Sequence, residues 1–383
     1  MKPRLFWTMG AILAAVCGLM TACGRVDRSP VRIGVQGPMS GDLAYEGVGF
    51  YRALQLLADQ VNDRGGVLGG RPVEVVVGDD RGDSEEARRV AERLVAEGVV
   101  AVVGSYNSDA TAAASAIYAE AGVLQITPAS TVMQLTEQGC PGFFRTCSTN
   151  ARQAQCAAGL MVDDLQRPRV ALVHDHSLYA YELAALAQAA IEVRGGTVVL
   201  STAVRLGQRD FTALIQELTE READALYFTG YYVEGGLLAR QMYESGLEVQ
   251  FVGGDALDTP EFVAYAGPAA AGTFVTTELL AQDMLQYPET AAFVADYEQA
   301  YGEFPASNRT LGAADGFRLV VYAIEQTGSD DPALLADYLH DELADFAGIT
   351  GPIEGFDEQG NRVGAISVVY QIDAGGQFVL YRR

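Results

Sequence analysis

The stretch that decides the fold is Val99-Val-Ala-Val-Val-Gly-Ser-Tyr-Asn-Ser108, an apolar run followed at once by small and polar residues. A continuous β-branched run is typical of a strand that is buried on both faces of a parallel sheet. Residues 110–121 then have a helical composition, and residues 123–126 form another short apolar run. Strand, helix and strand in this order predict one crossover unit of an α/β fold.

The same rhythm extends to both sides of this stretch. Before it, strands are predicted over 31–35 and 73–77 and a helix over 47–62, and Asp83-Ser-Glu-Glu86 resembles a capping box for a helix ending at Gly98. A second set follows Asn150, with predicted helices over 153–165, 181–194, 211–221 and 235–245 and strands over 170–173, 198–200, 225–228 and 250–252. Two such sets without a Pro/Ser-rich linker predict two doubly wound lobes joined by short crossovers. Their ligand crevices would lie at the carboxyl ends of the strands.

Composition excludes several classes of protein. A chain of 383 residues is too long for one compact domain. Its formal net charge of -24 would repel nucleic acids and anionic lipid headgroups, so neither is expected as a partner. The sequence has no phosphate-binding loop and no nucleophile elbow, and Gly47-Val-Gly49 is only a partial dinucleotide motif because Arg52 fills its third glycine position. We therefore expect no enzyme and no cofactor, with a hydrolase as the rival class.

The N-terminus resembles a lipoprotein signal. Lys2 and Arg4 precede an apolar run over 6–20, and the small Ala22 stands directly before Cys23. This pattern predicts a signal peptide over 1–22, lipidation of Cys23 and a tether over 23–28, which places the protein outside the cytoplasmic membrane on a lipid anchor. An ordinary signal peptide with an incidental cysteine is the alternative. The apolar run is too short for a membrane-spanning helix.

Three further cysteines, Cys140, Cys147 and Cys156, would lie in an oxidising compartment. The first two flank a predicted strand over 143–146, which would hold them ~20 Å apart. The pairing of Cys147 with Cys156 is therefore favoured, and the other pairings stay open. These spacings and only three histidines predict no metal site. His174 and His176 are expected to be surface or capping residues.

Polar residues follow two strands of the first set. The strand over 99–103 leads to Ser108, and the strand over 123–126 leads to Thr131. Both residues are predicted at helix N-termini, where free N–H groups and the helix dipole attract an anion. Each alone is explained by simple N-capping. Two of them at one edge of a lobe favour a carboxylate site.

Aromatic and acidic residues follow the strands of the second set. Tyr179 follows the strand over 170–173, Tyr231 follows the strand over 225–228, and Asp255 follows the strand over 250–252. A carboxylate beside aromatic faces attracts a cation. An anion site on one lobe and a cation site on the other predict a clamp for a zwitterion, of which an α-amino acid is the simplest.

Several short motifs then occur in a recognisable order. They are Val35-Gln-Gly-Pro-Met-Ser-Gly41, Asp79-Asp80, Gly104, Ile126-Thr-Pro-Ala129, Phe144-Arg-Thr146, Val173-His-Asp175, Asp210-Phe211 and Gly351-Pro-Ile-Glu-Gly-Phe-Asp357. In this order and spacing the chain resembles the branched-chain amino acid-binding proteins, which are periplasmic components of ABC importers. The resemblance covers nearly the whole mature chain.

The resemblance implies a periplasmic-binding-protein type I clamshell: an α/β fold of two Rossmann-like lobes with parallel sheets joined by three hinge crossovers. The first lobe would comprise 29–149 and 279–362, and the second 150–278 and 363–383. Ser108 and the backbone of Ala129 with Thr131 would hold a ligand carboxylate. Tyr231 and Asp255 would meet its ammonium group, and Tyr179 would close over the cleft.

Three positions depart from the pattern of the family. Asp255 stands where the best-known members have Glu, and Ser130 replaces a small apolar residue beside the carboxylate. Glu46 stands where they have an aromatic residue that packs on the ligand side chain, and the adjacent Tyr45 could substitute for it. These departures affect the preference for a side chain more than the amino-acid class.

The sequence therefore predicts a monomeric, non-enzymatic receptor that captures an aliphatic or branched-chain amino acid and delivers it to an ABC permease. Relatives that bind amides, urea, polyamines or aromatic acids share this fold, so a receptor for another small polar solute is the alternative. A tethered sensory subunit that uses the same clamshell is a further alternative.

Overall fold

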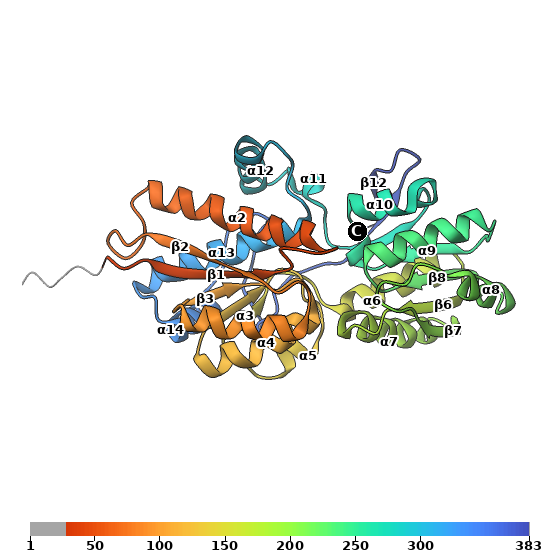
Figure 1. The fold of residues 1–383 in the computed structure, drawn as a ribbon, viewed down its shortest axis with the longest axis horizontal. Helices are drawn as coiled ribbons and strands as arrows, with labels where there is room; N and C mark the ends of the chain where they lie inside the picture. The colour runs from red at the N-terminus through yellow and green to blue at the C-terminus, as the bar shows by residue number, and fades with distance from the viewer. Residues whose placement is uncertain (1–27, 383) are drawn as a thin grey trace, which may run out of the picture.

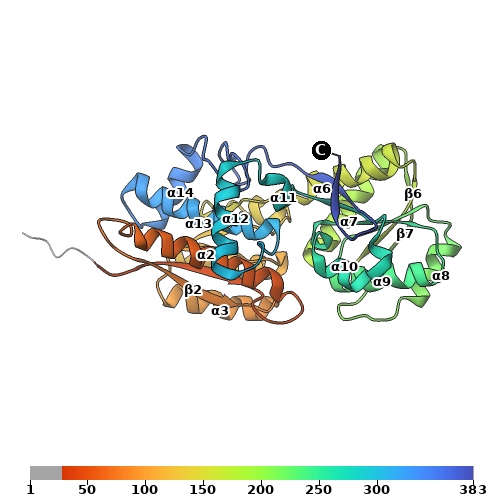
Figure 2. The same ribbon diagram turned by 90° about the horizontal axis from the view of Figure 1, so that it is seen from above.

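The computed structural model describes residues 28–382, so the predicted signal peptide and Cys23 lie outside the described residues. Figures 1 and 2 show two lobes side by side, joined near the middle of the molecule by extended segments. Each lobe is built on its own sheet. The predicted α/β architecture of two lobes is confirmed.

The first lobe is built on a five-stranded parallel sheet in the order β2-β1-β3-β4-β5. Its strands are β1 (Val31–Gly37), β2 (Val73–Asp79), β3 (Ala101–Val103), β4 (Leu124–Thr127) and β5 (Phe143–Arg145). Its helices are α2 (Ala44–Asp63), α3 (Ser84–Ala96), α4 (Ser108–Ala121), α5 (Gln134–Glu137), α12 (Pro288–Tyr301), α13 (Asn308–Thr327) and α14 (Pro332–Asp341).

Strand β3 shows why helices cover both faces of this sheet. Its middle residue, Val102, belongs to a buried cluster with Leu94 of α3 and Tyr118 of α4. Its neighbour Val103 belongs to another cluster, which contains Phe317 of α13. Successive side chains of a strand point to opposite faces, so an entirely apolar strand needs an apolar layer on each side.

The second lobe is built on a seven-stranded sheet in the order β12-β11-β10-β9-β8-β6-β7. Its strands are β6 (Arg169–His174), β7 (Thr197–Ala203), β8 (Ala225–Phe228), β9 (Gln250–Gly253), β10 (Phe274–Thr277), β11 (Val368–Ile372) and β12 (Phe378–Arg382). The strands β6 to β10 pair in parallel, whereas β11 and β12 pair antiparallel at one edge.

Helices also pack on the second sheet, and a short one begins the return to the first lobe. They are α6 (Asn150–Ala158), which continues as a π-helix over Gly159–Asp164, α7 (Leu178–Val193), α8 (Thr212–Glu220), α9 (Tyr232–Glu244), α10 (Pro260–Ala266) and α11 (Ala281–Met284), with 3₁₀ turns at Asp255–Leu257 and Gly267–Ala270. The chain passes between the lobes after β5, after β10 and before β11. The structure thus contains the three predicted crossovers.

Local signals explain where several elements begin. The Asp83 carboxylate accepts hydrogen bonds from the N–H groups of Glu85 and Glu86, so α3 begins where the capping motif predicts. The helix predicted over 153–165 begins earlier, at Asn150, and becomes a π-helix from Gly159. Gly104 has φ of +134°, and a Cβ atom there would collide with the Gln36 carbonyl. Glycine therefore lets the loop after β3 approach β1 closely.

The favoured disulfide between Cys147 and Cys156 is wrong, because all three cysteines of the described residues are free thiols. Cys147 is buried in the first crossover, with its sulfur 3.6 Å from the Ser130 carbonyl oxygen. Cys156 lies on α6, where its backbone carbonyl accepts a bond from Arg382. A helix rises about 1.5 Å per residue, so α6 carries Cys156 away from the crossover.

Candidate functional site

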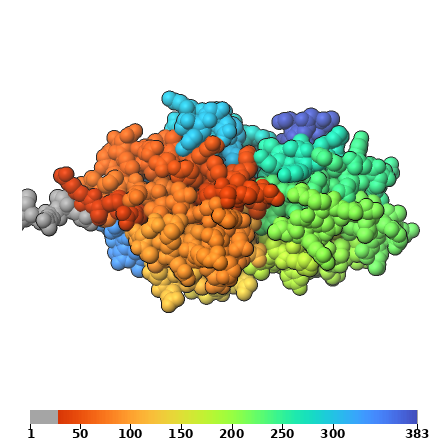
Figure 3. All heavy atoms as spheres, in the orientation of Figure 1, coloured from red at the N-terminus to blue at the C-terminus, as the bar shows by residue number. Residues whose placement is uncertain are grey.

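The loops at the carboxyl ends of both sheets meet at a small cavity between the lobes. Its volume is about 10 Å³, roughly the minimum for one water molecule. Figure 3 shows the lobes in contact across the middle of the face that it draws. The structure is therefore a closed conformation, and a ligand could reach the cavity only when the lobes part. The lining residues are Tyr106, Ser108, Ala129, Tyr179, Tyr231, Asp255, Ala256 and Arg309.

The first lobe contributes a wall suited to an anion. Ser108 is the first residue of α4, and Asn107 caps this helix without a side-chain hydrogen bond. The first N–H groups of a helix have no partner within it, so they can donate to a carboxylate. Ala129 lies on the loop after β4, where its N–H bonds the Thr127 hydroxyl at 3.3 Å. Ser108 and Ala129 thus both line the cavity, and the Ala129 N–H already has an acceptor within its own loop.

The second lobe contributes an aromatic and acidic wall. The Tyr179 hydroxyl donates to the Asp255 Oδ1 atom at 2.7 Å. The Tyr231 ring lies between two others, with centroids 5.7 Å from Tyr179 and 6.0 Å from Tyr106. Burial, with Asp255 nearby, raises the pKa of Tyr179 well above its usual value, so its hydroxyl stays protonated and donates. A carboxylate among aromatic faces is suited to a cation.

Two predicted residues lie behind the first wall and do not line the cavity. The prediction that Thr131 begins a helix is wrong, because α5 begins at Gln134. Its hydroxyl instead donates to the Asn150 side-chain oxygen at 2.7 Å. The Ser130 hydroxyl shares a 2.7 Å hydrogen bond with the Thr111 hydroxyl. Both side chains are buried and already have partners, so they support the loop after β4.

The predicted residues Tyr45 and Glu46 lie at the start of α2, outside the cavity lining. The Tyr45 hydroxyl donates to the Ala306 carbonyl, and Tyr45 lines a separate groove between the lobes of about 380 Å³. Glu46 is 0% exposed. Its Oε2 atom accepts a bond from the Ser307 hydroxyl at 2.6 Å, whereas its Oε1 atom has no hydrogen-bond partner.

Three residues that line the cavity were missed by the sequence analysis, namely Tyr106, Ala256 and Arg309, and Arg309, near the start of α13, has the most contacts to charged groups. Its guanidinium donates to Asp258 Oδ1 at 2.7 Å, to Asp255 Oδ2 at 3.3 Å and to the Asp255 carbonyl. It also lies 3.6 Å from Glu46 Oε1 and 5.8 Å from the centroid of the Tyr106 ring. No local pattern marks this arginine, because the fold alone brings it to partners that are distant in sequence.

Three carboxylates thus surround one guanidinium in a buried cluster, which we call the Arg309 cluster (Glu46, Asp255, Asp258 and Arg309). Burial raises the pKa of Glu46 to about 7 despite the opposing effect of Arg309. Burial also raises the pKa of Asp258, again against Arg309. The guanidinium is held charged by these neighbours, which raise its pKa. One cation does not balance three acids.

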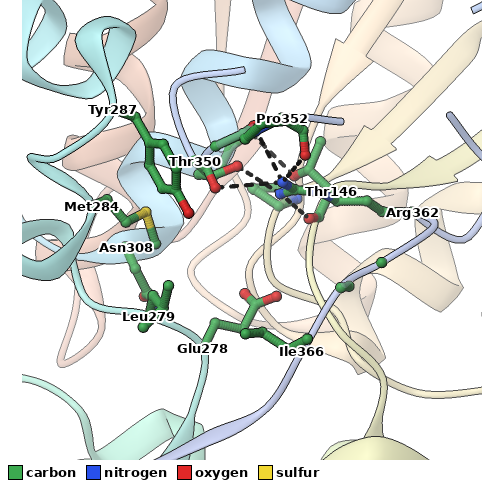
Figure 4. Close-up of a pocket in the computed structure, with 15 residues that line it drawn as sticks. Thr146, Glu278, Leu279, Met284, Tyr287, Asn308, Thr350, Pro352, Arg362 and Ile366 are labelled. Carbon is green, nitrogen blue, oxygen red and sulfur yellow. Dashed lines mark hydrogen bonds between the residues drawn. The ribbon is translucent and has the colours of Figure 1, made fainter. Parts of the chain in front are cut away.

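A larger cavity, of about 140 Å³, lies at the hinge (Figure 4). The Glu278 carboxylate, on the second crossover, points into it and accepts a bond from the Ser148 N–H at 2.7 Å. The Ser148 hydroxyl lies 3.3 Å from the Ser367 hydroxyl, so hydrogen bonds join all three crossovers. On the opposite wall, Arg362 is fixed by oxygen atoms of Thr350, Gly351 and Pro352.

Residues 28–382 contain no group of three or more His, Cys, Asp or Glu side chains that could hold a metal ion. Within the same residues, no helix is both long enough and apolar enough to cross a membrane. His174 and His176 contact each other, with ring centroids 5.1 Å apart and the His176 N–H bonded to the His174 Nδ1 atom.

Comparison with known proteins assigns the chain to a family. The sequence matches the family described as periplasmic binding protein over residues 30–377. The Leu/Ile/Val-binding protein homolog 1 of Brucella melitensis is 32% identical over 361 residues, which cover 94% of each chain.

Two solved structures are similar over nearly their whole length. The leucine-binding protein LivK of Thermotoga maritima is 29% identical with a TM-score of 0.83, over 92% of this chain and 97% of that one. The branched-chain amino acid transporter substrate-binding protein LivJ of Streptococcus pneumoniae was solved with isoleucine. It is 27% identical with a TM-score of 0.81, over 93% of this chain and 100% of that one. The chain therefore belongs to the periplasmic binding protein family, as a relative of its branched-chain amino acid-binding members.

Proposed function

We propose that the protein is an extracytoplasmic receptor that binds one free α-amino acid between its lobes and delivers it to the permease of an ABC importer. It acts as a monomer and catalyses no reaction. In this proposal the lobes have the predicted limits, 29–149 with 279–362 and 150–278 with 363–383. Family membership supports the periplasmic location.

The observation that carries the proposal is the pairing of two unlike walls across one interlobe cavity. Ser108 and the free N–H groups of α4 would hold the ligand carboxylate, beside Ala129. Asp255 and Tyr231 would hold its ammonium group, and Tyr179 would cover the cleft while orienting Asp255. A zwitterion satisfies both walls, whereas a simple anion or cation satisfies only one.

Calorimetry with matched ligands tests this function. Because the relatives are named as Leu/Ile/Val-binding and branched-chain amino acid-binding proteins, leucine, isoleucine and valine are tested first, followed by alanine. Free leucine should bind, and both leucine amide, which lacks the carboxylate, and N-acetyl-leucine, which lacks the ammonium, should bind at least about a hundredfold more weakly. Acetamide, urea, putrescine and benzoate represent the alternative solutes. Tighter binding of one of these than of every amino acid would contradict the proposal.

We further propose that Cys23 is lipidated and that this anchor holds the mature protein to a membrane. The support is the sequence Ala22-Cys23 after a short apolar run. Because each buried CH₂ of an acyl chain contributes ~0.8 kcal/mol, loss of the chains should end anchoring. Cys23→Ser should therefore abolish incorporation of labelled fatty acid and release the protein to the soluble fraction. Unchanged labelling of the variant would exclude this site.

A further inference from the structure

When Glu46 is ionised, at a pH above its pKa of about 7, the charges of the Arg309 cluster do not balance. Glu46, Asp255 and Asp258 are each less than one-tenth exposed, and Arg309 is the one cation in contact with them among the described residues. Buried charges are costly unless they are paired. An amino-acid ammonium group on Asp255 and the guanidinium on Asp258 would pair two of the three acids. Glu46 would then be the acid without a cation of its own.

The contacts of Glu46 agree with this count. Its Oε1 atom accepts no hydrogen bond and lies 3.6 Å from Arg309 Nη1, beyond hydrogen-bond distance. Arg309 is committed to other atoms, with Asp258 Oδ1 at 2.7 Å and the Asp255 carbonyl as a further acceptor. The Oε1 atom of Glu46 is therefore a fully buried acceptor that still lacks a donor, whereas Oε2 has one in the Ser307 hydroxyl.

The surrounding rings add a second feature that suits cations. Tyr106, whose hydroxyl also has no hydrogen-bond partner, contacts the Arg309 guanidinium through its ring face. Tyr231 and Tyr179 continue this row of rings across the cavity. Aromatic faces attract cationic nitrogen, most strongly where water is excluded. A branched aliphatic side chain would give these acids and rings no charged partner beyond Arg309.

We propose that the receptor selects an amino acid whose side chain ends in a second cationic nitrogen, with Glu46 as the partner of that nitrogen. This inference rests on the proposed function and departs from the aliphatic preference expected from the relatives. Asp258 and Ser307, which contact Arg309 and Glu46, also line the groove of about 380 Å³. A long basic side chain therefore has space beyond the small cavity once the lobes part.

Matched pairs of ligands isolate the second charge. Lysine and norleucine have the same carbon chain, and lysine adds the terminal ammonium group. Arginine and citrulline are a similar pair that differ in the charge of the terminal group. Calorimetry on the wild-type protein should find lysine at least about tenfold tighter than norleucine, and arginine tighter than citrulline, because each charged member pairs a buried acid. Raised salt should weaken lysine binding more than norleucine binding.

Two variants assign the effect to Glu46. Glu46→Gln should reduce the lysine-to-norleucine preference to within about threefold, because the amide keeps the shape but removes the charge. Glu74→Gln makes the same charge change on an exposed residue of β2 that pairs with Arg32, and it should leave the preference as in wild type. Circular dichroism confirms that each variant is folded, and the wild-type comparison does not depend on either variant.

The outcomes separate the two proposals. Norleucine or leucine binding as tightly as lysine to the wild type would overturn this inference and leave the amino-acid receptor standing. If Glu46→Gln still preferred lysine over norleucine as strongly as the wild type does, the role of Glu46 would be overturned. Failure of every amino acid in the panel to bind would overturn the proposed function itself.

Discussion

Asp255 has two partners in this closed conformation, and they act differently on a ligand. Tyr179 lies in the same lobe, and its hydroxyl holds one carboxylate oxygen in place. Arg309 comes from the other lobe and occupies the second oxygen and the backbone carbonyl. An arriving ammonium group must therefore compete with Arg309 for Asp255, whereas Tyr179 prepares Asp255 for either cation.

The first prediction concerns Asp255. Asp255→Asn should weaken amino-acid binding by ~2–5 kcal/mol, because the ligand ammonium would be buried without its counter-charge. Ser108→Ala should cost only ~1–3 kcal/mol, because backbone N–H groups would still hold the carboxylate. Calorimetry on both variants with the best wild-type ligand measures the difference. Wild-type affinity in Asp255→Asn would show that the zwitterion clamp is wrong.

Residues at strand ends were predictable because they follow from local pattern. Ser108 follows a buried strand of the first sheet, and Tyr179, Tyr231 and Asp255 follow buried strands of the second. Parallel strands bring such positions to the carboxyl edge of each sheet, and the two edges meet at the cavity. Thr131 was misplaced because polar residues after a strand do not reveal where the next helix begins. Arg309 gave no signal, because its role depends on contacts between segments far apart in the chain.

At the scale of elements, the three crossovers form a hydrogen-bonded hinge. Glu278 on the second crossover accepts a bond from Ser148 on the first, and Ser148 contacts Ser367 on the third. Burial raises the pKa of Glu278 to about 7, with Arg362 opposing the shift. A carboxylate that titrates near neutral pH thus lies where the lobes are joined.

The second prediction is a pH dependence of stability from Glu278. Its pKa is raised in the folded state, so its contribution is fully present below about pH 4.5 and is lost as pH rises through about 7. Glu278→Gln has no charge to bury and should exceed the wild type in free energy of unfolding by about 1–3 kcal/mol at pH 8. The difference should shrink towards pH 5. Urea unfolding at both pH values measures it, and the exposed-site variant Glu74→Gln should show no such trend.

Element boundaries were predictable where both apolar pattern and capping residues were present. The helix after Asp83 has both signals and begins where expected. The pattern analysis yielded no elements beyond residue 252, and therefore missed the antiparallel pair β11 and β12. Their turn is held by the Asp373 carboxylate, which accepts bonds from the N–H groups of Gly375 and Gln377. Such a short hairpin gains its stability from pairing with β10, which local sequence does not reveal.

At the scale of the whole molecule, contacts outside the cavity also hold the lobes together. The Tyr232 hydroxyl of the second lobe donates to the Asp42 carbonyl of the first at 2.6 Å. The Leu178 N–H donates to Asp109 Oδ2 at 2.9 Å. These contacts and the Arg309–Asp255 ion pair join the lobes directly, so they contribute to the stability of the closed form. A ligand can then shift the balance only by its preference for the closed form.

The last prediction measures this balance through Tyr232, which joins the lobes but does not line the cavity. Tyr232→Phe removes one interlobe hydrogen bond, worth ~1 kcal/mol, and should favour the open form by about fivefold. Small-angle scattering should show a larger radius of gyration for the ligand-free variant than for ligand-free wild type. Apparent affinity should fall by up to the same factor, because less protein is closed before binding.

Saturating ligand should bring both proteins to the same compact radius, since the variant retains every proposed ligand contact. Ser108→Ala provides the complementary case. It should weaken binding while leaving the ligand-free radius as in wild type, because it removes a proposed ligand contact and, among the described residues, the Ser108 hydroxyl forms no hydrogen bond to the second lobe. The two variants therefore separate the cost of closing from the strength of ligand contacts. A wild-type radius that does not change at saturating ligand, together with an unchanged radius in Tyr232→Phe, would mean that the lobes do not move and that the hinged mechanism must be abandoned.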